Sequence, residues 1–172
     1  MSTPNFEYLD IPAGRFALAD MRSRLGARII DTVIIGIPIG IVDAVIYRAS
    51  VPYDDSAEVG SGFGIDELLL AIVLGLAFSF AYEVGLTATQ GATFGKKALG
   101  IRVASADTAG APGEGIGIGP ACARWATLML PSALCGLWGL LCSASPLRDG
   151  AARQGWHDRA SKTYVLAMIA EP

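Results

Sequence analysis

The chain has 172 residues, of which 52% are hydrophobic and 17% are charged, and its mean hydropathy is +0.47. A soluble domain with an ordinary polar surface is less apolar than this, so we expect a single-domain integral membrane protein. The formal net charge of −3 offers no concentrated basic face for nucleic acid, so we expect the lipid bilayer and no nucleic acid among its partners.

Residues 1–20 form a polar amino-terminal tail, which we expect to lie in the cytoplasm. Pro4, Asp10, Pro12 and Asp20 interrupt the apolar runs within it. A cleavable signal peptide needs an unbroken apolar core, so we expect the first span itself to direct insertion. The scattered apolar side chains of the tail can lie along the membrane surface.

The first predicted transmembrane helix covers residues 21–47 and carries three charged residues near its start, Arg24, Arg28 and Asp31. At 3.6 residues per turn these positions stand within one face of a helix, so their charges are able to meet. An ionised group at membrane depth is costly and normally faces protein or a water-filled cavity. We therefore expect Asp31 to point inward, with Arg24 or Arg28 as its partner.

The same helix contains a GxxxG pair, Gly36 and Gly40, around Pro38. Missing side chains at this spacing let another backbone approach closely, which favours tight helix packing. A proline inside a helix produces a kink, and a kink can instead open a hinge or a binding cavity. The sequence leaves both interpretations open.

The second predicted transmembrane helix covers residues 65–88 and follows a hydrophilic loop. Ala71, Gly75 and Ser79 recur at intervals of four residues and form a smooth ridge, which we expect to meet the first helix. Glu83 lies near the far end of this helix. It either reaches interfacial water or joins the aspartate and an arginine of the first helix in a polar cluster.

Residues 91–120 are polar and rich in glycine, and we expect them to form a loop with some structure. Residues 91–97 superficially match a phosphate-binding loop, but three residues rather than four separate the glycines, and Lys97 replaces the Ser or Thr that would hold magnesium. We therefore reject a phosphate loop. The stretches 100–104 and 163–167 both have the character of short strands, so they can pair as a small sheet.

A third apolar segment, residues 125–147, has no charged residue and is long enough for a single span. Basic residues concentrate before the first span, in the second loop and in the tail, so the positive-inside rule puts all three in the cytoplasm. Three full crossings would leave the tail outside. Pro131, Gly136 and Gly139 can instead fold the segment into a re-entrant hairpin, which we favour over the single span. The expected fold is thus an all-α integral membrane protein with two full transmembrane helices, this third segment and a small cytoplasmic β element.

The sequence gives little support to a metal site or a catalytic site. Cys122, Cys135 and Cys142 show no CxxC spacing and lie in or beside an apolar run, where we expect them to pack as small hydrophobic side chains. His157 is the only histidine, and a transition-metal cage would need further ligands. No nucleophile is placed beside it, so we expect no enzyme, no bound metal and no cofactor.

Four motifs follow one another along the chain. The first motif is Arg24 near the start of the first helix, with Asp31 seven residues later. The second is a glycine-threonine-glycine-lysine stretch, and the third is an arginine before the last apolar segment. The fourth is a histidine-aspartate pair that precedes a strand beginning with threonine. The residues of the three later motifs are Gly91, Thr93, Gly95, Lys96, Arg124, His157, Asp158 and Thr163. This ordered set resembles the RDD family of small bacterial membrane proteins. The chain departs from the family pattern at Ala92, where a polar residue is common, and at Trp156.

The resemblance divides the chain into an amino-terminal tail (1–20), an RDD-like membrane domain (21–167) and a carboxyl-terminal end (168–172). It implies a multi-pass protein of the bacterial inner membrane, and the charge distribution adds a cytoplasmic amino terminus. The activity that it implies is transport of a ligand not yet identified.

Two functional hypotheses follow. In the first, the chain is part of a small-ion or proton-coupled transport system, with Asp31 as the titrating or ion-binding carboxylate and Arg24 as its charge partner. Because two or three spans enclose no pathway, this hypothesis requires a homo-oligomer or other membrane subunits, with a small cation or a proton as the ligand. In the second, Arg24, Asp31 and Asp158 form a polar clasp in a non-catalytic accessory or structural membrane protein. The residues expected in the transport site or polar cluster are Arg24, Arg28, Asp31, Glu83, Arg124, His157 and Asp158.

Overall fold

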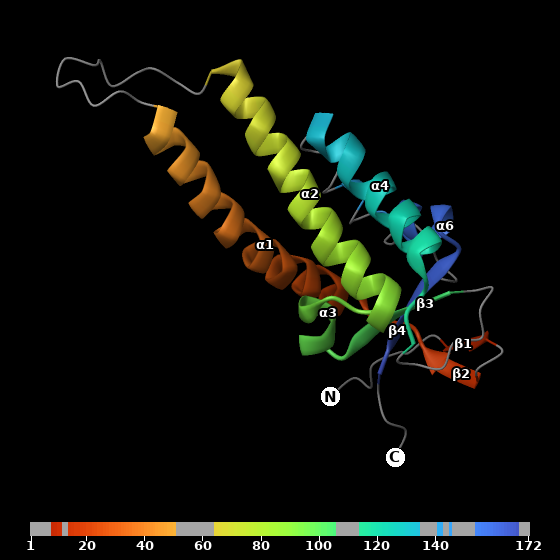
Figure 1. Cartoon of the computed structure of the whole chain (residues 1–172). Helices are drawn as coiled ribbons and strands as arrows, with labels where there is room; N and C mark the ends of the chain where they lie inside the picture. Colours follow the sequence, from red (N-terminus) through yellow and green to blue (C-terminus); the bar gives the residue numbers. More distant parts are fainter. Residues whose placement is uncertain are drawn as a thin grey trace.

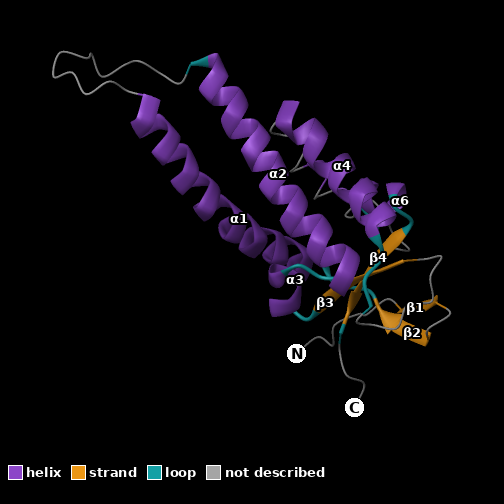
Figure 2. Ribbon diagram, in the orientation of Figure 1, coloured by secondary structure: helices purple, strands orange, loops and turns teal. Residues whose placement is uncertain are grey.

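The structure is a computed structural model that describes residues 8–11, 14–50, 64–105, 114–134, 141–142, 145 and 154–168. Two long helices, α1 and α2, run along each other, and α4 packs along α2 (Figure 1). Most of the short elements gather where α1 begins and α2 ends (Figure 2). The elements in chain order are β1 Tyr8–Ile11, β2 Gly14–Ala17, α1 Met21–Ser50, α2 Ile65–Gln90, α3 Phe94–Ala98, β3 Ile101–Ser105, α4 Ile118–Leu134, α6 Trp156–Ala160 and β4 Thr163–Ala167.

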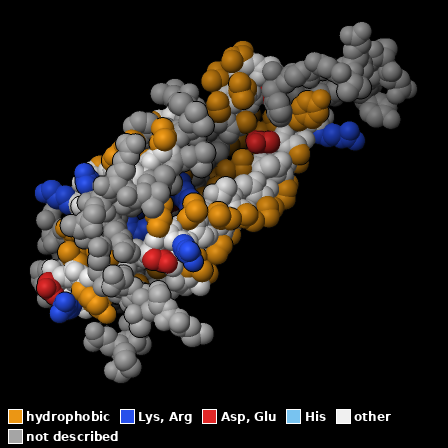
Figure 3. All heavy atoms as spheres, turned by 180° about the vertical axis from the view of Figure 1, so that it is seen from behind, with side chains coloured by type: hydrophobic (Ala, Val, Ile, Leu, Met, Phe, Trp, Pro, Cys, Tyr) orange, Lys and Arg blue, Asp and Glu red, His pale blue; other side chains and the backbone are white. Residues whose placement is uncertain are grey.

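Two of these helices are long and apolar enough to cross a membrane. The mean hydropathy is 2.2 over Met21–Ala49 and 2.0 over Ile65–Gln90. Their apolar side chains face outward: Ile37 is 61% exposed and Val45 is 62% exposed, and patches of apolar side chains are visible along the elongated body in Figure 3. Apolar surface of this extent needs lipid or another protein to cover it. The two predicted spans are confirmed as helices, and α1 continues to Ser50.

Helix α4 begins at Ile118, seven residues before the predicted start of the third apolar segment. A core of Val84, Ile116, Ala121 and Trp125 joins α2 to α4. This packing extends the helix toward its amino terminus, into residues that precede the apolar run. Much of the remaining segment lies outside the described residues, so its route as a span or a hairpin stays a prediction.

The small-residue ridge of α2 faces two partners rather than one. A Cβ on Gly75 would lie 3.8 Å from Ile39 Cδ1, so this position faces α1 as predicted. Ser79 instead lies against α4, where its hydroxyl accepts a hydrogen bond from Trp125 Nε1 at 3.0 Å. The prediction that the whole ridge meets α1 is therefore wrong at Ser79, because a buried indole N–H needs an acceptor.

The glycines of the GxxxG pair do not make a close helix contact. A Cβ on Gly36 or Gly40 would meet nothing within 4 Å. Gly36 instead lines a cavity between α1, α2 and α4, and Pro38 lies inside α1. The structure thus places Gly36, but not Gly40, at a cavity, and neither glycine packs closely against another described helix.

The fold is mostly helical but not all-α, because the described residues form two antiparallel two-stranded sheets. β3 and β4 pair with Ile101 opposite Ala167, so the two stretches with strand character do meet. β1 and β2 form a hairpin in the stretch expected to be a tail, and Leu18 continues it as a bridge to Leu166. Both leucines are buried, so this end of the tail packs against β4 rather than lying along a membrane surface. The side of the membrane on which the sheets lie stays a prediction.

Candidate functional site

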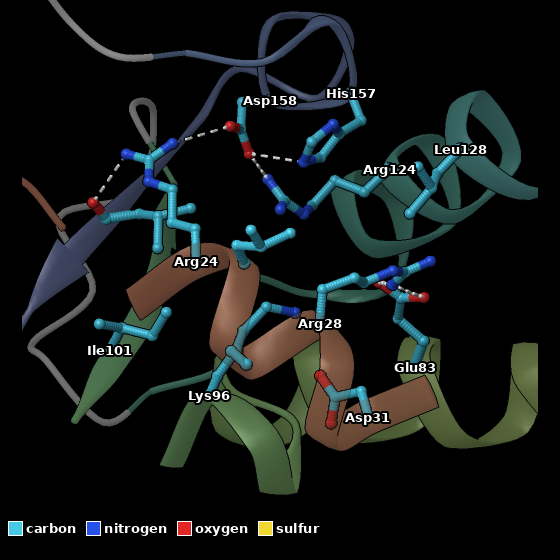
Figure 4. Close-up of a pocket in the computed structure, with 13 residues that line it drawn as sticks. Arg24, Arg28, Asp31, Glu83, Lys96, Ile101, Arg124, Leu128, His157 and Asp158 are labelled. Atoms are coloured by element: carbon cyan, nitrogen blue, oxygen red, sulfur yellow. Dashed lines mark hydrogen bonds and ion pairs between the residues drawn. The ribbon is translucent and has the colours of Figure 1, made fainter. Parts of the chain in front are cut away.

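Charged side chains gather where the start of α1 meets α2, α3, α4 and α6 (Figure 4). Together with a few apolar side chains they line a small cavity of about 60 Å³, which we call the polar cavity. The seven residues that the sequence groups as a cluster all line it, and Lys96 of the loop motif joins them. The titratable residues around the polar cavity are Arg24, Arg28, Asp31, Glu83, Lys96, Arg124, His157 and Asp158.

Asp31 is held by three neutral donors from two other segments. Tyr82 of α2 donates its hydroxyl to Oδ1 at 2.7 Å, Thr93 donates its hydroxyl to Oδ2 at 2.6 Å, and the Gly95 backbone N–H donates to Oδ1 at 2.8 Å. Asp31 is only 2% exposed, so these bonds replace water around its carboxylate. This one side chain therefore fastens α1 to both α2 and α3.

The glycine-threonine-glycine stretch builds the cradle for Asp31. Gly91 ends α2 in the left-handed conformation with a φ of 66°, which turns the chain back toward α1. Thr93 precedes α3 and uses its hydroxyl on Asp31 rather than on the helix. Gly95 lies so close to α1 that a Cβ would collide with the Ala27 carbonyl oxygen and lie 2.8 Å from Asp31 Oδ1. The contact with Asp31 therefore requires these residue types at these positions.

The prediction that Arg24 or Arg28 pairs with Asp31 is wrong, because both arginines bind other carboxylates. Arg28 Nη1 donates to both carboxylate oxygens of Glu83, at 3.1 Å each. Glu83 is 8% exposed, so it belongs to the polar cluster and does not reach interfacial water. Spacing along the first helix cannot reveal that hydrogen-bond donors from the second loop, rather than an arginine, bind the Asp31 carboxylate.

Asp158 is the second acidic centre and is 1% exposed. Arg124 contacts its Oδ1, Arg24 Nη1 lies 3.5 Å from its Oδ2, and the Gly155 N–H donates to Oδ2 at 2.9 Å. Burial alone would raise the pKa of Asp158, but the positive charge of Arg124 and Arg24 outweighs burial and holds that pKa at about 2. Arg124 also donates to the Thr163 hydroxyl, so this carboxylate links α1, α4, α6 and β4.

His157 lies between Asp158 and Cys142. Its Nε2 is 3.5 Å from Asp158 Oδ1, and its Nδ1 is 3.3 Å from Cys142 Sγ. Burial lowers the pKa of His157 to about 4, although the charge of Asp158 acts in the opposite direction, so the imidazole is neutral near pH 7. Cys142 is fully buried, in keeping with a packing role, and it also contacts this imidazole.

Lys96 brings a fourth basic side chain to the polar cavity, and its amino group points into that cavity in Figure 4. Burial lowers the pKa of Lys96, while the carboxylate of Glu83 opposes this effect. With His157 neutral, the cluster holds four basic side chains and three carboxylates. Within the described ranges of the chain, no three His, Cys, Asp or Glu side chains are placed to hold a metal ion.

A larger cavity of about 360 Å³ lies between α1, α2 and α4, and we call it the interhelical cavity. Its walls are mostly apolar, but Arg28 and Asp31 lie at its border and also line the polar cavity. The two cavities therefore share this pair of residues in their walls. The lining residues of the interhelical cavity are Arg28, Asp31, Thr32, Ile35, Gly36, Ile39, Ile72, Gly75, Leu76, Ser79, Met129 and Ser132.

The motifs that meet in the cluster agree with one known family. The model of the RDD family matches residues 18–162, which is most of the chain. The chain belongs to the RDD family. No curated protein and no solved structure matches it. It is thus an RDD membrane protein with two apolar helices long enough to span the bilayer, and its RDD motifs converge on the polar cavity.

Two residues of the RDD site were missed by sequence reasoning. Tyr82 binds Asp31, but an aromatic residue near the end of a span is ordinary in a membrane helix. Cys142 contacts His157 across fifteen positions of chain, and no spacing rule connects the two. In both cases the partner is brought in by tertiary packing rather than by a local pattern.

Proposed function

We propose that this RDD protein takes part in the transport of small cations or protons across the membrane. The observation that carries the proposal is that Arg28 and Asp31 line both the interhelical cavity and the polar cavity. Ionisable groups at membrane depth are costly and typically mark ion or proton pathways. A cation in the interhelical cavity would lie beside Asp31, which lines that cavity, whereas Glu83 lines the polar cavity.

The ion pair of Arg28 and Glu83 is the group that would control this passage. Its two hydrogen bonds depend on a charged Glu83 carboxylate. A proton on Glu83 would remove that charge and free the Arg28 guanidinium to turn aside. Proton uptake would therefore open the way between the two cavities and couple proton movement to that of another ion.

Two helices enclose no pathway by themselves, so transport requires a homo-oligomer or other membrane subunits. The outward apolar face of α1 supports such an assembly, since Ile37, Ile41 and Val45 are all exposed and a Cβ on Gly40 would meet nothing within 4 Å. These residues would give a partner helix a smooth apolar surface.

We place the polar cavity on the cytoplasmic side of a bacterial inner membrane, because the basic residues at this end of the helices favour the cytoplasm. A reporter enzyme fused after Pro172 should then be active only in the cytoplasm. A reporter that is active only outside the cell would contradict this orientation.

Ion flux into proteoliposomes tests the transport proposal. Wild-type protein should dissipate an imposed pH gradient faster than empty liposomes when a panel of alkali cations is supplied. Glu83→Gln keeps the size of the side chain but can no longer take up and release a proton, so this proton-coupled flux should slow about tenfold, which corresponds to about 1.4 kcal/mol in the barrier. Asp66→Asn changes an exposed residue in the first turn of α2 and should have no effect. Absence of wild-type flux, or a wild-type rate in Glu83→Gln, would refute the proposal.

A second candidate function is structural: the protein would be a non-catalytic accessory membrane protein whose buried charges form a clasp. The observation that favours it is that Asp31 and Asp158 are both fully buried and bound by several donors from different elements. In this case Asp31→Asn lowers the abundance of the protein and the wild type shows no flux. In the transport case Asp31→Asn protein that inserts and assembles loses a flux that the wild type has.

A further inference from the structure

A third pocket, of about 260 Å³, lies beside α3 and β3, and we call it the basic pocket. Its lining residues are Lys97, Gly100, Ile101, Arg102 and Met168. Of these described residues two are basic and none is acidic. The basic pocket shares only Ile101 with the polar cavity and no residue with the interhelical cavity. In Figure 1, α3 and β3 lie at the end of the molecule where α1 begins and α2 ends.

The two cations of the basic pocket are held beside each other by Gln90. Lys97 Nζ donates to the side-chain carbonyl oxygen of Gln90, and Arg102 Nη1 donates to its backbone carbonyl oxygen at 3.3 Å. Both acceptors are neutral. Among the described residues, neither Lys97 nor Arg102 forms an ion pair with a carboxylate. Two like charges at one site repel each other, and an anion bound between them would remove that cost.

Gln90 also fixes the level of the basic pocket relative to the bilayer. It is the last residue of the apolar stretch of α2 that is long enough to span a membrane. The pocket therefore lies where this helix leaves the hydrocarbon, at the level of the lipid headgroups. Phe94 and Leu99 flank Lys97 along the chain and are both exposed, and Lys97 Nζ lies 5.5 Å from the centroid of the Phe94 ring. An exposed aromatic side chain is typical of the membrane interface.

The size and chemistry of the basic pocket fit a phosphodiester. Its volume is many times the roughly 30 Å³ that one water molecule occupies in the liquid. A Cβ on Gly100 would meet nothing within 4 Å, so the space beside this residue is open. A guanidinium group binds phosphate oxygens through paired N–H groups, and an ammonium group binds them as a point charge. A headgroup that carries its own ammonium would place a third cation beside Lys97 and Arg102, so an anionic lipid is favoured.

We infer that the basic pocket binds the phosphate of an anionic phospholipid, of the phosphatidylglycerol type, from the leaflet in which α2 ends. Lys97 and Arg102 contact the phosphate oxygens, and the acyl chains stay in the bilayer. The pocket is not a phosphate loop, because it offers two side-chain charges rather than a run of backbone N–H groups. The inference does not depend on the proposed transport function, since lipid binding is measured without flux.

Native mass spectrometry of the protein in a neutral detergent tests the inference. Wild-type protein should bind phosphatidylglycerol with an apparent affinity at least about tenfold higher than phosphatidylcholine, because each cation near an anionic lipid favours its binding. A double variant with Lys97→Gln and Arg102→Gln should lose this preference. Arg22→Gln is the matched control, since Arg22 is an exposed basic residue at the start of α1 that does not line the pocket, and it should keep the wild-type preference. Wild-type protein without a preference, or a double variant that keeps it, would overturn the inference.

Two further measurements separate a lipid from a soluble anion, and binding from folding. Phosphatidylglycerol should raise the melting temperature of the wild type, whereas inorganic phosphate should not. An equal rise with inorganic phosphate would assign the pocket to a soluble anion and overturn the lipid assignment. A variant with Lys97→Arg and Arg102→Lys retains both charges and should keep the lipid preference, even if the glutamine variant does not fold. Loss of the preference in this charge-retaining variant would contradict binding by the two cations.

Discussion

At the scale of single residues, the buried acids of this RDD protein are satisfied in two different ways. Asp31 accepts hydrogen bonds from neutral groups of Tyr82, Thr93 and Gly95. Asp158 is bound by guanidinium groups, which hold its pKa at about 2 after outweighing the opposite effect of burial. Removal of one donor should therefore leave an unsatisfied buried acceptor at Asp31. Around Asp158, by contrast, stability should depend mainly on pH, because the groups there change their charge.

Thr93→Val should destabilise the protein. The substitution keeps the shape of the side chain but removes the hydroxyl that donates to Asp31 Oδ2, and an unsatisfied buried acceptor costs about 1–3 kcal/mol. Thermal unfolding in detergent micelles measures the change. Thr89→Val is the matched control, since the Thr89 hydroxyl is exposed and bonds only within α2. Equal melting temperatures for Thr93→Val and Thr89→Val would contradict the assigned role of Thr93.

Protonation of His157 should make the protein less stable at acidic pH. Its pKa falls from the ordinary value of 6.5 to about 4 on folding, mainly because the ring is buried. Between these values the unfolded chain binds the extra proton, so stability is full above about pH 6.5 and declines as the pH falls toward about 4. The decline should amount to about 3 kcal/mol, at about 1.4 kcal/mol per pKa unit. Asp158 adds a separate loss of stability when the pH falls below 3.8, the ordinary pKa of its carboxyl group.

His157→Gln provides the check on this pH dependence, because glutamine does not titrate. Its unfolding free energy, followed in detergent micelles across the same pH range, should stay level between about pH 6.5 and about pH 4. A decline as steep as that of the wild type would show that another group is responsible.

At the scale of elements, the docking of α3 on α1 is the contact on which the site depends. Gly95→Ala should separate the two helices, because its Cβ has no room beside the Ala27 carbonyl and Asp31. We expect a loss of stability of about 1–3 kcal/mol, typical of an overpacked contact. Gly85→Ala is the control, since a Cβ there meets nothing within 4 Å and a helical alanine is favoured by roughly 0.5–1 kcal/mol. A Gly95→Ala variant as stable as the wild type would contradict the close approach.

The elements also show which parts of the structure a sequence can predict. α1 and α2 follow directly from long apolar runs, and the strand character of residues 100–104 and 163–167 is visible in their alternation. The β1–β2 hairpin was not predicted, because its strands are four residues each and pack on β4, a segment far along the chain. Short strands gain their stability from such distant partners, which local patterns do not reveal.

At the scale of the whole molecule, the sequence indicates which charges meet but not how they pair. The charged residues and the histidine of the RDD motifs all line one cavity, yet Asp31 binds loop donors while Arg28 binds Glu83. Helix periodicity places residues on a face of their own helix, and the partner depends on how three segments pack. The interhelical cavity, which gives the cluster its proposed role, likewise arises only when α1, α2 and α4 are assembled.

The central claim is that water and ions reach Arg28 and Asp31 through the interhelical cavity. In a variant with its three cysteines replaced, a single cysteine at Ile39 would line that cavity, whereas one at Ile41, which is 61% exposed, would lie on the outer face of α1 toward lipid or a partner helix. Mass spectrometry of the protein in vesicles after treatment with a charged thiol reagent compares the two positions. Modification of Ile39→Cys but not of Ile41→Cys is the expected result. No modification at Ile39→Cys, or equal modification of both, would contradict the account.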